Sequence, residues 1–557
     1  DFVLLVVAAD EGVMPQTQEH LEICSILGIE HGLVAVTKVD MVEPELLELA
    51  QEDVQDHLQG TFLEQAPIFP VSAHTGEGVD ALRQAVTEFC GSLQVVRETD
   101  LFRLPVDRVF TMRGHGTVIT GTLVSGQVAV GEELAVYPQQ KRTRVRSLQV
   151  HGQEVSTALA GQRTACNLAG LEVGSLQRGD VLARPGTLAP SQMWDLELTC
   201  LSSAPRPLRH RTELHFHHGS REILARIYLL DRDLLQPGES ALAQVRFTEP
   251  MVGVFGDRFV LRAYAPLRTI GGGRVLGPVA GKIKRHSGQV EQLQALANSE
   301  EREVVARQLA RSGHSGLDIH RLRVVTGVPG KRLEKHLQDL GSKQEALLFD
   351  REERSYVHGE VLEELKADVQ RFLVRYHRQH PMRVGVTRSE FASGWGRSIP
   401  VKLLHFVLER AVKEGVIQKT EDAYHAPEHR VSLAADQEQF KAAFLARYQQ
   451  AGLRPPNLRE VLAELDVSHK EAEPVLRLLA EAGELVKVKE DLYFAPEAIE
   501  DLKTQVREYF QSRESMNPTD FKDLTGLSRK YTIPLLEFLD REKVTMRVGD
   551  VRHLRQG

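Results

Sequence analysis

The sequence predicts a multidomain α/β + β + α protein with a partial doubly wound α/β domain, two antiparallel β-barrels and four tandem winged-helix domains. Three patterns support this prediction. Apolar runs alternate with helical patterns up to residue 93, short strands separated by Gly and Pro continue to about residue 285, and a turn then recurs along the remaining chain. The length of 557 residues agrees with several domains, because one domain usually holds roughly 100–200 residues.

The composition excludes several classes of protein. Hydrophobic residues make up 42% and charged residues 26% of the chain, as is usual for globular proteins. No run of about 18 apolar residues occurs, so we expect no membrane-spanning helix and no membrane partner. The 4 Cys residues lie far apart in the sequence, which excludes a redox or zinc site built from neighbouring cysteines. This usage favours a reducing compartment, and we expect a cytoplasmic monomer.

Charge is distributed unevenly along the chain. Residues 1–93 contain 2 Lys or Arg and 17 Asp or Glu, whereas residues 94–290 contain 25 basic and 17 acidic side chains. Residues 291–557 are balanced, with 42 basic and 43 acidic side chains. A basic middle segment favours a polyanionic partner such as nucleic acid, although basic side chains scattered over a solvated surface would give the same count.

The acidic segment has the strand and helix order of a doubly wound parallel sheet, whose ligands bind beyond the carboxyl ends of the strands. The apolar run that follows Asp1 has the character of a central strand. Because a domain does not normally begin in the middle of its sheet, we interpret the chain as N-terminally truncated. The expected strands are 2–8, 33–36 and 68–71, and the expected helices are 17–28, 44–58 and 79–89.

Two polar motifs, Thr37-Lys38-Val39-Asp40 and Val71-Ser72-Ala73-His74, directly follow two of these strands. Here the chain resembles translational GTPases, which implies a GTP cofactor with Mg²⁺. The resemblance implies that Asp40 accepts hydrogen bonds from guanine, that the Lys38 stem lies over the base, and that the backbone N–H of Ala73 meets the guanine carbonyl. Thr37 and Ser72 complete the implied guanine site. Thr37 and His74 replace the usual Asn and Lys of these motifs, so the contacts of those longer side chains are not carried over.

The phosphate-binding motif G-x-x-x-x-G-K-[ST] does not occur anywhere in the sequence. Without it the chain has no loop to hold phosphates and no hydroxyl side chain to hold Mg²⁺. We therefore assign no catalytic residue, and we do not expect these 557 residues to hydrolyse GTP, although the resemblance is to GTPases. We attribute the missing motif to the truncation.

The basic segment changes to short alternating strands with Gly turns, which predicts two small antiparallel barrels. The run Arg113–Gly121 resembles the second domain of elongation factor Tu. Three further runs, His215–Glu222, Gly256–Arg262 and Thr269–Leu276, resemble the selenocysteine-specific elongation factor (SelB) family. We interpret the histidines at 215–218 as structural and predict no metal site, because no carboxylate pair lies near them in the sequence.

The resemblance to SelB implies an aminoacyl pocket formed by Asp107, Arg108 and Arg163. Such a factor must distinguish selenocysteine from serine on the same tRNA. A selenol is ionised at neutral pH and a serine hydroxyl is not, so guanidinium groups would stabilise the selenolate and would gain nothing from serine.

The carboxyl half repeats one helical module. Turns at 326–329, 395–398, 465–468 and 525–528 are 69, 70 and 60 residues apart, and each is followed by a helical apolar pattern and a short hairpin. These are the features of a winged helix. The predicted domains are the partial GTPase domain 1–93, the barrels 100–187 and 188–285, and the winged helices 288–359, 360–430, 431–497 and 498–557.

A winged helix can bind nucleic acid or serve only as a protein-contact module. The last copy is the best candidate for RNA binding, because cations and an aromatic residue open its second helix and further cations lie along its wing. We interpret the first two copies as spacers. The candidate RNA-binding residues are Arg529, Lys530, Tyr531, Arg541, Lys543, Arg547 and Arg552.

Together the resemblance implies a GTP-dependent elongation factor that delivers selenocysteyl-tRNA to the ribosome at in-frame UGA codons and binds a selenoprotein mRNA hairpin. Two alternatives remain open. A general aminoacyl-tRNA carrier of the elongation factor Tu type would need only residues 1–285, and the four-module tail argues against it. A nucleotide-independent RNA-binding regulator would explain the missing phosphate loop, and an upstream reading frame encoding that loop would exclude it.

Overall fold

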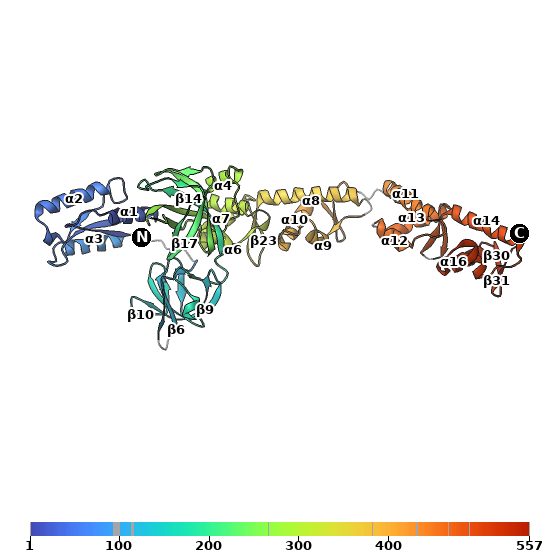
Figure 1. Ribbon diagram of the computed structural model, residues 1–557, viewed down its shortest axis with the longest axis horizontal. Coiled ribbons are helices and arrows are strands. Elements are labelled where there is room, and N and C mark those ends of the chain that lie inside the picture. Colours follow the sequence, from blue (N-terminus) through green and yellow to red (C-terminus); the bar gives the residue numbers. More distant parts are fainter. Residues whose placement is uncertain are drawn as a thin grey trace. The chain divides into compact units, whose positions relative to one another are not determined.

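The computed structural model describes residues 2–92, 101–112, 116–265, 267–380, 383–429, 433–465, 467–489 and 491–555 (Figure 1). The chain divides into two compact units, Asp1–Val361 and Leu362–Gly557. Each unit is described by itself below.

The first unit opens with a three-stranded parallel sheet in the order β1-β2-β3. The central strand β2 is the most buried, from Gly32 to Val36, because neighbours cover both of its edges and faces. Helix α1 begins at Pro15, two residues before the expected start, since proline suits the first turn of a helix. The elements are β1 (Val3–Ala8), α1 (Pro15–Ile26), β2 (Gly32–Thr37), the 3₁₀ turn η1 (Val39–Met41), α2 (Pro44–Leu58), β3 (Ile68–Pro70) and α3 (Val79–Ser92).

The first barrel is a curved antiparallel sheet in the order β4-β13-β8-β9-β12-β6-β5, which wraps around a core that includes Phe102, Ile119 and Leu148. The run Arg113–Gly121 is described only in part, because Arg113, Gly114 and His115 lie outside the described residues. The strands are β4 (Arg103–Pro105), β5 (Arg108–Met112), β6 (Gly116–Thr122), β7 (Gln127–Ala129), β8 (Glu133–Tyr137), β9 (Lys141–Val150), β10 (Gln153–Val155), β11 (Thr157–Leu159), β12 (Arg163–Leu168) and β13 (Val181–Ala183).

The second barrel is closed, in the order β14-β19-β17-β16-β20-β21. Its core contains Trp194, which is fully buried and meets the edge of the Phe216 ring. Glycine is required at Gly272 of β21, because a side chain there would collide with Ile26 of α1. The strands are β14 (Ser191–Cys200), β15 (Leu208–Arg209), β16 (Glu213–His218), β17 (Arg221–Leu229), β18 (Leu234–Leu235), β19 (Ser240–Met251), β20 (Arg258–Arg262) and β21 (Thr269–Gly277).

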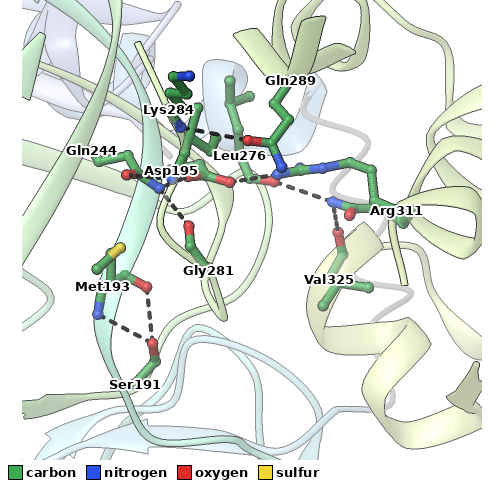
Figure 2. Close-up of polar contacts among 12 residues, drawn as sticks. Ser191, Met193, Asp195, Gln244, Leu276, Gly281, Lys284, Gln289, Arg311 and Val325 are labelled. Carbon is green, nitrogen blue, oxygen red and sulfur yellow. Dashed lines mark hydrogen bonds and ion pairs between the residues drawn. The ribbon is translucent and has the colours of Figure 1, made fainter. Parts of the chain in front are cut away.

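The first helical module, which we interpret as a spacer, packs directly on the barrels. Val324 lies in one core with Tyr137 of the first barrel and Val254 of the second. Figure 2 shows the polar part of this junction, where Arg311 reaches the buried Asp195. The module contains α4 (Gly288–Ala297), α5 (Glu301–Arg311), β22 (Leu317–Asp318), α6 (Ile319–Thr326), α7 (Gly330–Ser342), β23 (Ala346–Asp350) and β24 (Ser355–His358).

The second unit repeats a three-helix module with a short antiparallel hairpin. In each copy, the second helix begins after a residue whose side chain accepts backbone N–H groups. These residues are Thr387, Asn457 and Asn517, each within a capping box. The elements of the first copy are α8 (Gly359–Gln379), which begins in the first unit, β25 (Val386–Thr387), α9 (Arg388–Ser393), α10 (Val401–Lys413), β26 (Gln418–Thr420) and β27 (Ala423–His425).

The last two copies share a core that contains Val488 and Phe494 of one copy and Phe521 and Leu539 of the other. None of the helices in the described ranges is long and apolar enough to cross a membrane. The elements are α11 (Leu433–Ala451), α12 (Leu458–Glu464), α13 (His469–Glu481), β28 (Val486–Lys489), β29 (Leu492–Phe494), α14 (Pro496–Ser512), α15 (Pro518–Thr525), α16 (Arg529–Arg541), β30 (Thr545–Val548) and β31 (Val551–Leu554).

Candidate guanine, aminoacyl and RNA sites

The two guanine motifs meet because they follow neighbouring parallel strands, β2 and β3. Ser72 is fully buried, and its Oγ accepts the backbone N–H groups of His74 at 3.2 Å and Thr75 at 3.1 Å. A hydrogen bond from Ser72 lowers the pKa of the Asp40 carboxyl below its ordinary value. Asp40 is therefore an exposed, ionised acceptor at the sheet edge, with the backbone of the exposed Ala73 beside it.

Lys38 is held at the same edge by two acidic residues that follow β1. Its Nζ lies 2.9 Å from Asp10 and 3.2 Å from Glu11, and these hydrogen bonds raise the pKa of the Lys38 amine. The backbone of Lys38 is left-handed, with φ of 60°, while Thr37 ends β2 and its hydroxyl donates to the carbonyl of Val7 at 3.4 Å. The sequence analysis missed Asp10 and Glu11, although an acidic pair directly after a parallel strand was a usable signal.

The predicted aminoacyl residues come together in the first barrel. Asp107 lies between β4 and β5, and Arg163, the first residue of β12, forms an ion pair with its carboxylate. Arg108 begins β5, and Nε of Arg178 lies 3.9 Å from Asp107. The hydrogen bond from Arg163, with the charges of Arg178 and Arg108, holds the pKa of Asp107 below its usual range. Arg163 and Arg178 thus pair with one carboxylate on which the charge of Arg108 also acts, and the sequence analysis missed Arg178.

The candidate RNA-binding residues of the last module fall into two groups. Arg529 and Lys530 are exposed at the start of α16, and Lys543 and Arg547 are exposed on or near the wing. The Lys530 amine lies 5.2 Å from the centre of the Tyr531 ring.

The second group supports the fold. Tyr531 donates its hydroxyl to the Pro455 carbonyl at 3.0 Å, and Arg541 donates to the carbonyls of Lys487 and Val488 at 3.2 Å. Arg552 is only 4% exposed and donates to Asp540 at 2.8 Å. The prediction of Arg552 as an RNA contact is therefore wrong, because its guanidinium is consumed inside the module.

Five family models match separate parts of the chain. They are the elongation factor Tu GTP-binding domain at 1–92, elongation factor Tu domain 2 at 116–183, the selenocysteine-specific elongation factor β-barrel domain at 195–282, and two winged-helix domains of elongation factor SelB at 370–425 and 508–554. The predicted combination of a partial GTPase domain, β-barrels and winged helices is confirmed.

Comparisons with whole proteins agree. The chain is 52% identical over 556 residues to the selenocysteine-specific elongation factor of Desulfomicrobium baculatum, covering 100% of this chain and 88% of that protein. It is 30% identical over 567 residues to that of Escherichia coli strain K12, covering 100% and 86%. A crystal structure of the bacterial selenocysteine-specific elongation factor EF-Sec matches with a TM-score of 0.63 at 26% identity, covering 100% of this chain and 86% of that one. The chain therefore belongs to the selenocysteine-specific elongation factor (SelB) family.

Proposed function

We propose that this protein delivers selenocysteyl-tRNA to the ribosome in a GTP-dependent manner while its carboxyl-terminal modules bind an mRNA hairpin near an in-frame UGA codon. The observation that carries this proposal is the group of three arginines around Asp107. Aminoacyl-tRNA carriers differ in the chemistry of the aminoacyl group that they accept. The charge of this site therefore bears directly on the substrate.

The excess of positive charge suits a selenolate. Asp107 neutralises one guanidinium, which leaves a surplus of positive charge among Arg108, Arg163 and Arg178, all of which act on this carboxylate. An ionised selenocysteine side chain would be stabilised by this surplus. A serine hydroxyl is neutral and would offer no charge in return for the water that the arginines lose. This difference would separate two amino acids that share one tRNA.

The residues at the sheet edge fit a guanine base. The ionised Asp40 carboxylate can accept from two guanine donors, whereas adenine does not present that pair. We assign Thr37, Lys38, Asp40, Ser72 and Ala73 to the base alone, because the sequence contains no phosphate-loop motif. Bound Mg²⁺ would neutralise phosphate charge in such a nucleotide complex. No residue of this chain is assigned to hydrolysis.

The exposed cations of the last module suit an RNA hairpin. Arg529 and Lys530 lie at the start of α16, which presents backbone N–H groups and cations to a phosphate. Lys543 and Arg547 extend the basic surface toward the wing, and the partly exposed Tyr531 ring can stack on an unpaired base. Arg541 adds a further positive charge, and its guanidinium also donates to the Lys487 carbonyl of the preceding module.

The deciding experiment measures the affinities of the full chain for selenocysteyl-tRNA and seryl-tRNA prepared from the same tRNA. A clear preference for the selenocysteyl form supports the proposal. Equal affinities would favour a general carrier of the elongation factor Tu type.

A titration with selenoprotein mRNA hairpins and scrambled hairpins at two salt concentrations tests the RNA arm. Binding that depends on hairpin sequence supports the proposal. Weak binding that disappears at the higher salt would indicate only phosphate attraction, and the modules would then contact another partner.

A further inference from the structure

The hairpin between β16 and β17 of the second barrel touches the first barrel beside Asp107. Its tip carries His218, Gly219, Ser220 and Arg221, which belong to a sequence run that marks the family but has no role in the sites described above. Gly219 adopts a left-handed turn with φ of 56°, and a Cβ placed there would lie 3.7 Å from Pro105. The tip therefore rests on the strand that leads to the aminoacyl pocket.

Ser220 fixes the residue that precedes Asp107. Its hydroxyl donates to the carbonyl oxygen of Val106 at 2.7 Å. The same carbonyl accepts the N–H of Gly179 at 2.8 Å, and the N–H of Val106 donates to Asp180 O at 2.7 Å. Val106 is fully buried, so its backbone position is determined from both barrels.

Arg221 stabilises the neighbouring turn of the first barrel, residues 177–180. It is only 8% exposed, and its Nη1 lies 3.5 Å from Oδ1 of the fully buried Asp180. The Asp180 carboxylate also accepts from Gln177 N at 3.0 Å, which closes the turn that carries Arg178. Gly179 has a φ of 92° and lies against the Arg221 side chain, so a side chain at this position would collide with it.

His218 makes the third connection. Its Nε2 lies 3.1 Å from Asp257, which also receives two hydrogen bonds from Nη1 of Arg103 at 2.7 and 2.9 Å. Burial opposes ionisation of Asp257, but Arg103 and His218 hold its pKa well below the ordinary value. Arg103 belongs to β4, the strand that runs directly into Asp107.

We infer that Ser220 and Arg221 of the second barrel are positioning residues for the aminoacyl pocket of the first barrel, acting through Val106 and Asp180 on Asp107, Arg108 and Arg178. This inference rests on the proposed function. Ser220 and Arg221 contact Val106 and the turn at 177–180 directly, and His218 is linked to Arg103 through Asp257. Small displacements of a charged group in a pocket cost much of its selectivity.

The test compares variants of the full chain by their affinities for selenocysteyl-tRNA and seryl-tRNA and by thermal unfolding. Ser220→Ala removes one hydrogen bond, and we expect the ratio of affinities to fall about 3- to 10-fold, with little change in Tm. Arg221→Gln should lower the ratio at least as much. Ser220→Thr restores the hydroxyl and should recover the ratio.

Glu222→Gln is the matched control, because Glu222 lies on the same hairpin, is exposed, and pairs with His215 rather than with the first barrel. This variant should keep the ratio. The double variant Ser220→Ala with Arg163→Ala should lose less selectivity than the two single changes added together, since both changes act on one pocket.

Equal weakening of both tRNA complexes by Ser220→Ala and Arg221→Gln would overturn the positioning role, as would independent, additive effects in the double variant. An unchanged ratio in both hairpin variants, with a reduced ratio in Arg163→Ala, would remove the positioning role and leave the proposed pocket intact. An unchanged ratio in Arg163→Ala would overturn the pocket itself, and the positioning role with it.

Discussion

Arg311 of the first helical module donates a hydrogen bond of 2.6 Å to Asp195, a fully buried carboxylate on β14 that alternates with the barrel-core residues Trp194 and Leu196. Gln244 donates to the other carboxylate oxygen at 2.7 Å (Figure 2). Burial raises the pKa of Asp195, and Arg311 is the main opposing influence. Nearby, Gln308 bridges Leu276 O of the barrel at 3.2 Å and Val325 O of the module at 2.7 Å. The module and the barrel thus share one buried polar network.

Arg311→Met should destabilise the first unit by about 3–5 kcal/mol, because it leaves a buried carboxylate without its partner. Chemical denaturation of the full chain measures this loss. Arg307→Met is the control on the same helix, since Arg307 pairs with Glu303 on the surface and should cost less than about 1 kcal/mol. Adding Asp195→Asn to Arg311→Met should recover part of the stability. An Arg311→Met protein as stable as the Arg307→Met protein would contradict the prediction.

Arg163→Ala should reduce the preference for selenocysteyl-tRNA over seryl-tRNA by about tenfold or more, because it removes a charge-assisted contact worth roughly 1.5–3 kcal/mol. Competition binding with the two aminoacyl-tRNAs measures the preference. Arg142→Ala is the control, since Arg142 is an exposed arginine of the same barrel that pairs with Glu133. Equal loss of affinity for both tRNAs would contradict the pocket assignment.

In the protein completed with a phosphate loop, Asp40→Asn should shift nucleotide preference from guanine toward xanthine, because the amide can donate where the carboxylate could only accept. Affinities for GTP and for xanthosine triphosphate, measured side by side, test this. Asp56→Asn in the same domain, at an exposed position far along α2 from the sheet edge, should leave both affinities unchanged. Unchanged GTP affinity with no gain for the xanthosine nucleotide in the Asp40 variant would exclude the contact.

The second unit should lose stability as the pH falls from about 6.5 to about 4. Burial, with the charges of His429 and His425, lowers the pKa of His377 from 6.5 to about 4. His377 is 6% exposed and stacks on His429 at 3.6 Å. In this window the unfolded chain binds a proton that the folded module excludes, so stability rises with pH and is complete above 6.5.

The titration of His377 changes the free energy of unfolding by up to about 3 kcal/mol across this pH window. Thermal unfolding at several pH values measures it, and His377→Gln should flatten the dependence across this window. If the His377→Gln variant loses as much stability at low pH as the unchanged protein, other titrating groups cause the loss.

Local patterns in the sequence were sufficient for the strands and helices of the first domain, because strand periodicity and turn residues act over a few neighbours. They placed Asp40 and Ser72 at strand ends, and parallel pairing then brought the two together. The partners of Lys38 lie 28 and 27 positions away across the sheet, and Arg311 lies 116 positions from Asp195. Such pairs depend on how finished domains pack. The prediction for Arg552 failed within one module, since the charges along the wing gave no indication that this arginine pairs with Asp540 in the interior.

Arg529→Ala should weaken binding of the mRNA hairpin by about 1–3 kcal/mol if its guanidinium contacts a base, by analogy with base contacts in DNA. Arg529 is exposed at the first position of α16, where the positive end of the helix adds to its own charge. Fluorescence titration at two salt concentrations separates base contacts from phosphate contacts. Arg477→Ala on the corresponding helix α13 of the preceding module is the control, because Arg477 is 78% exposed and pairs with Glu481. Arg552→Ala should lower stability first and binding only as a consequence. A change confined to the salt dependence would make Arg529 a phosphate contact, which positions the hairpin without reading its sequence.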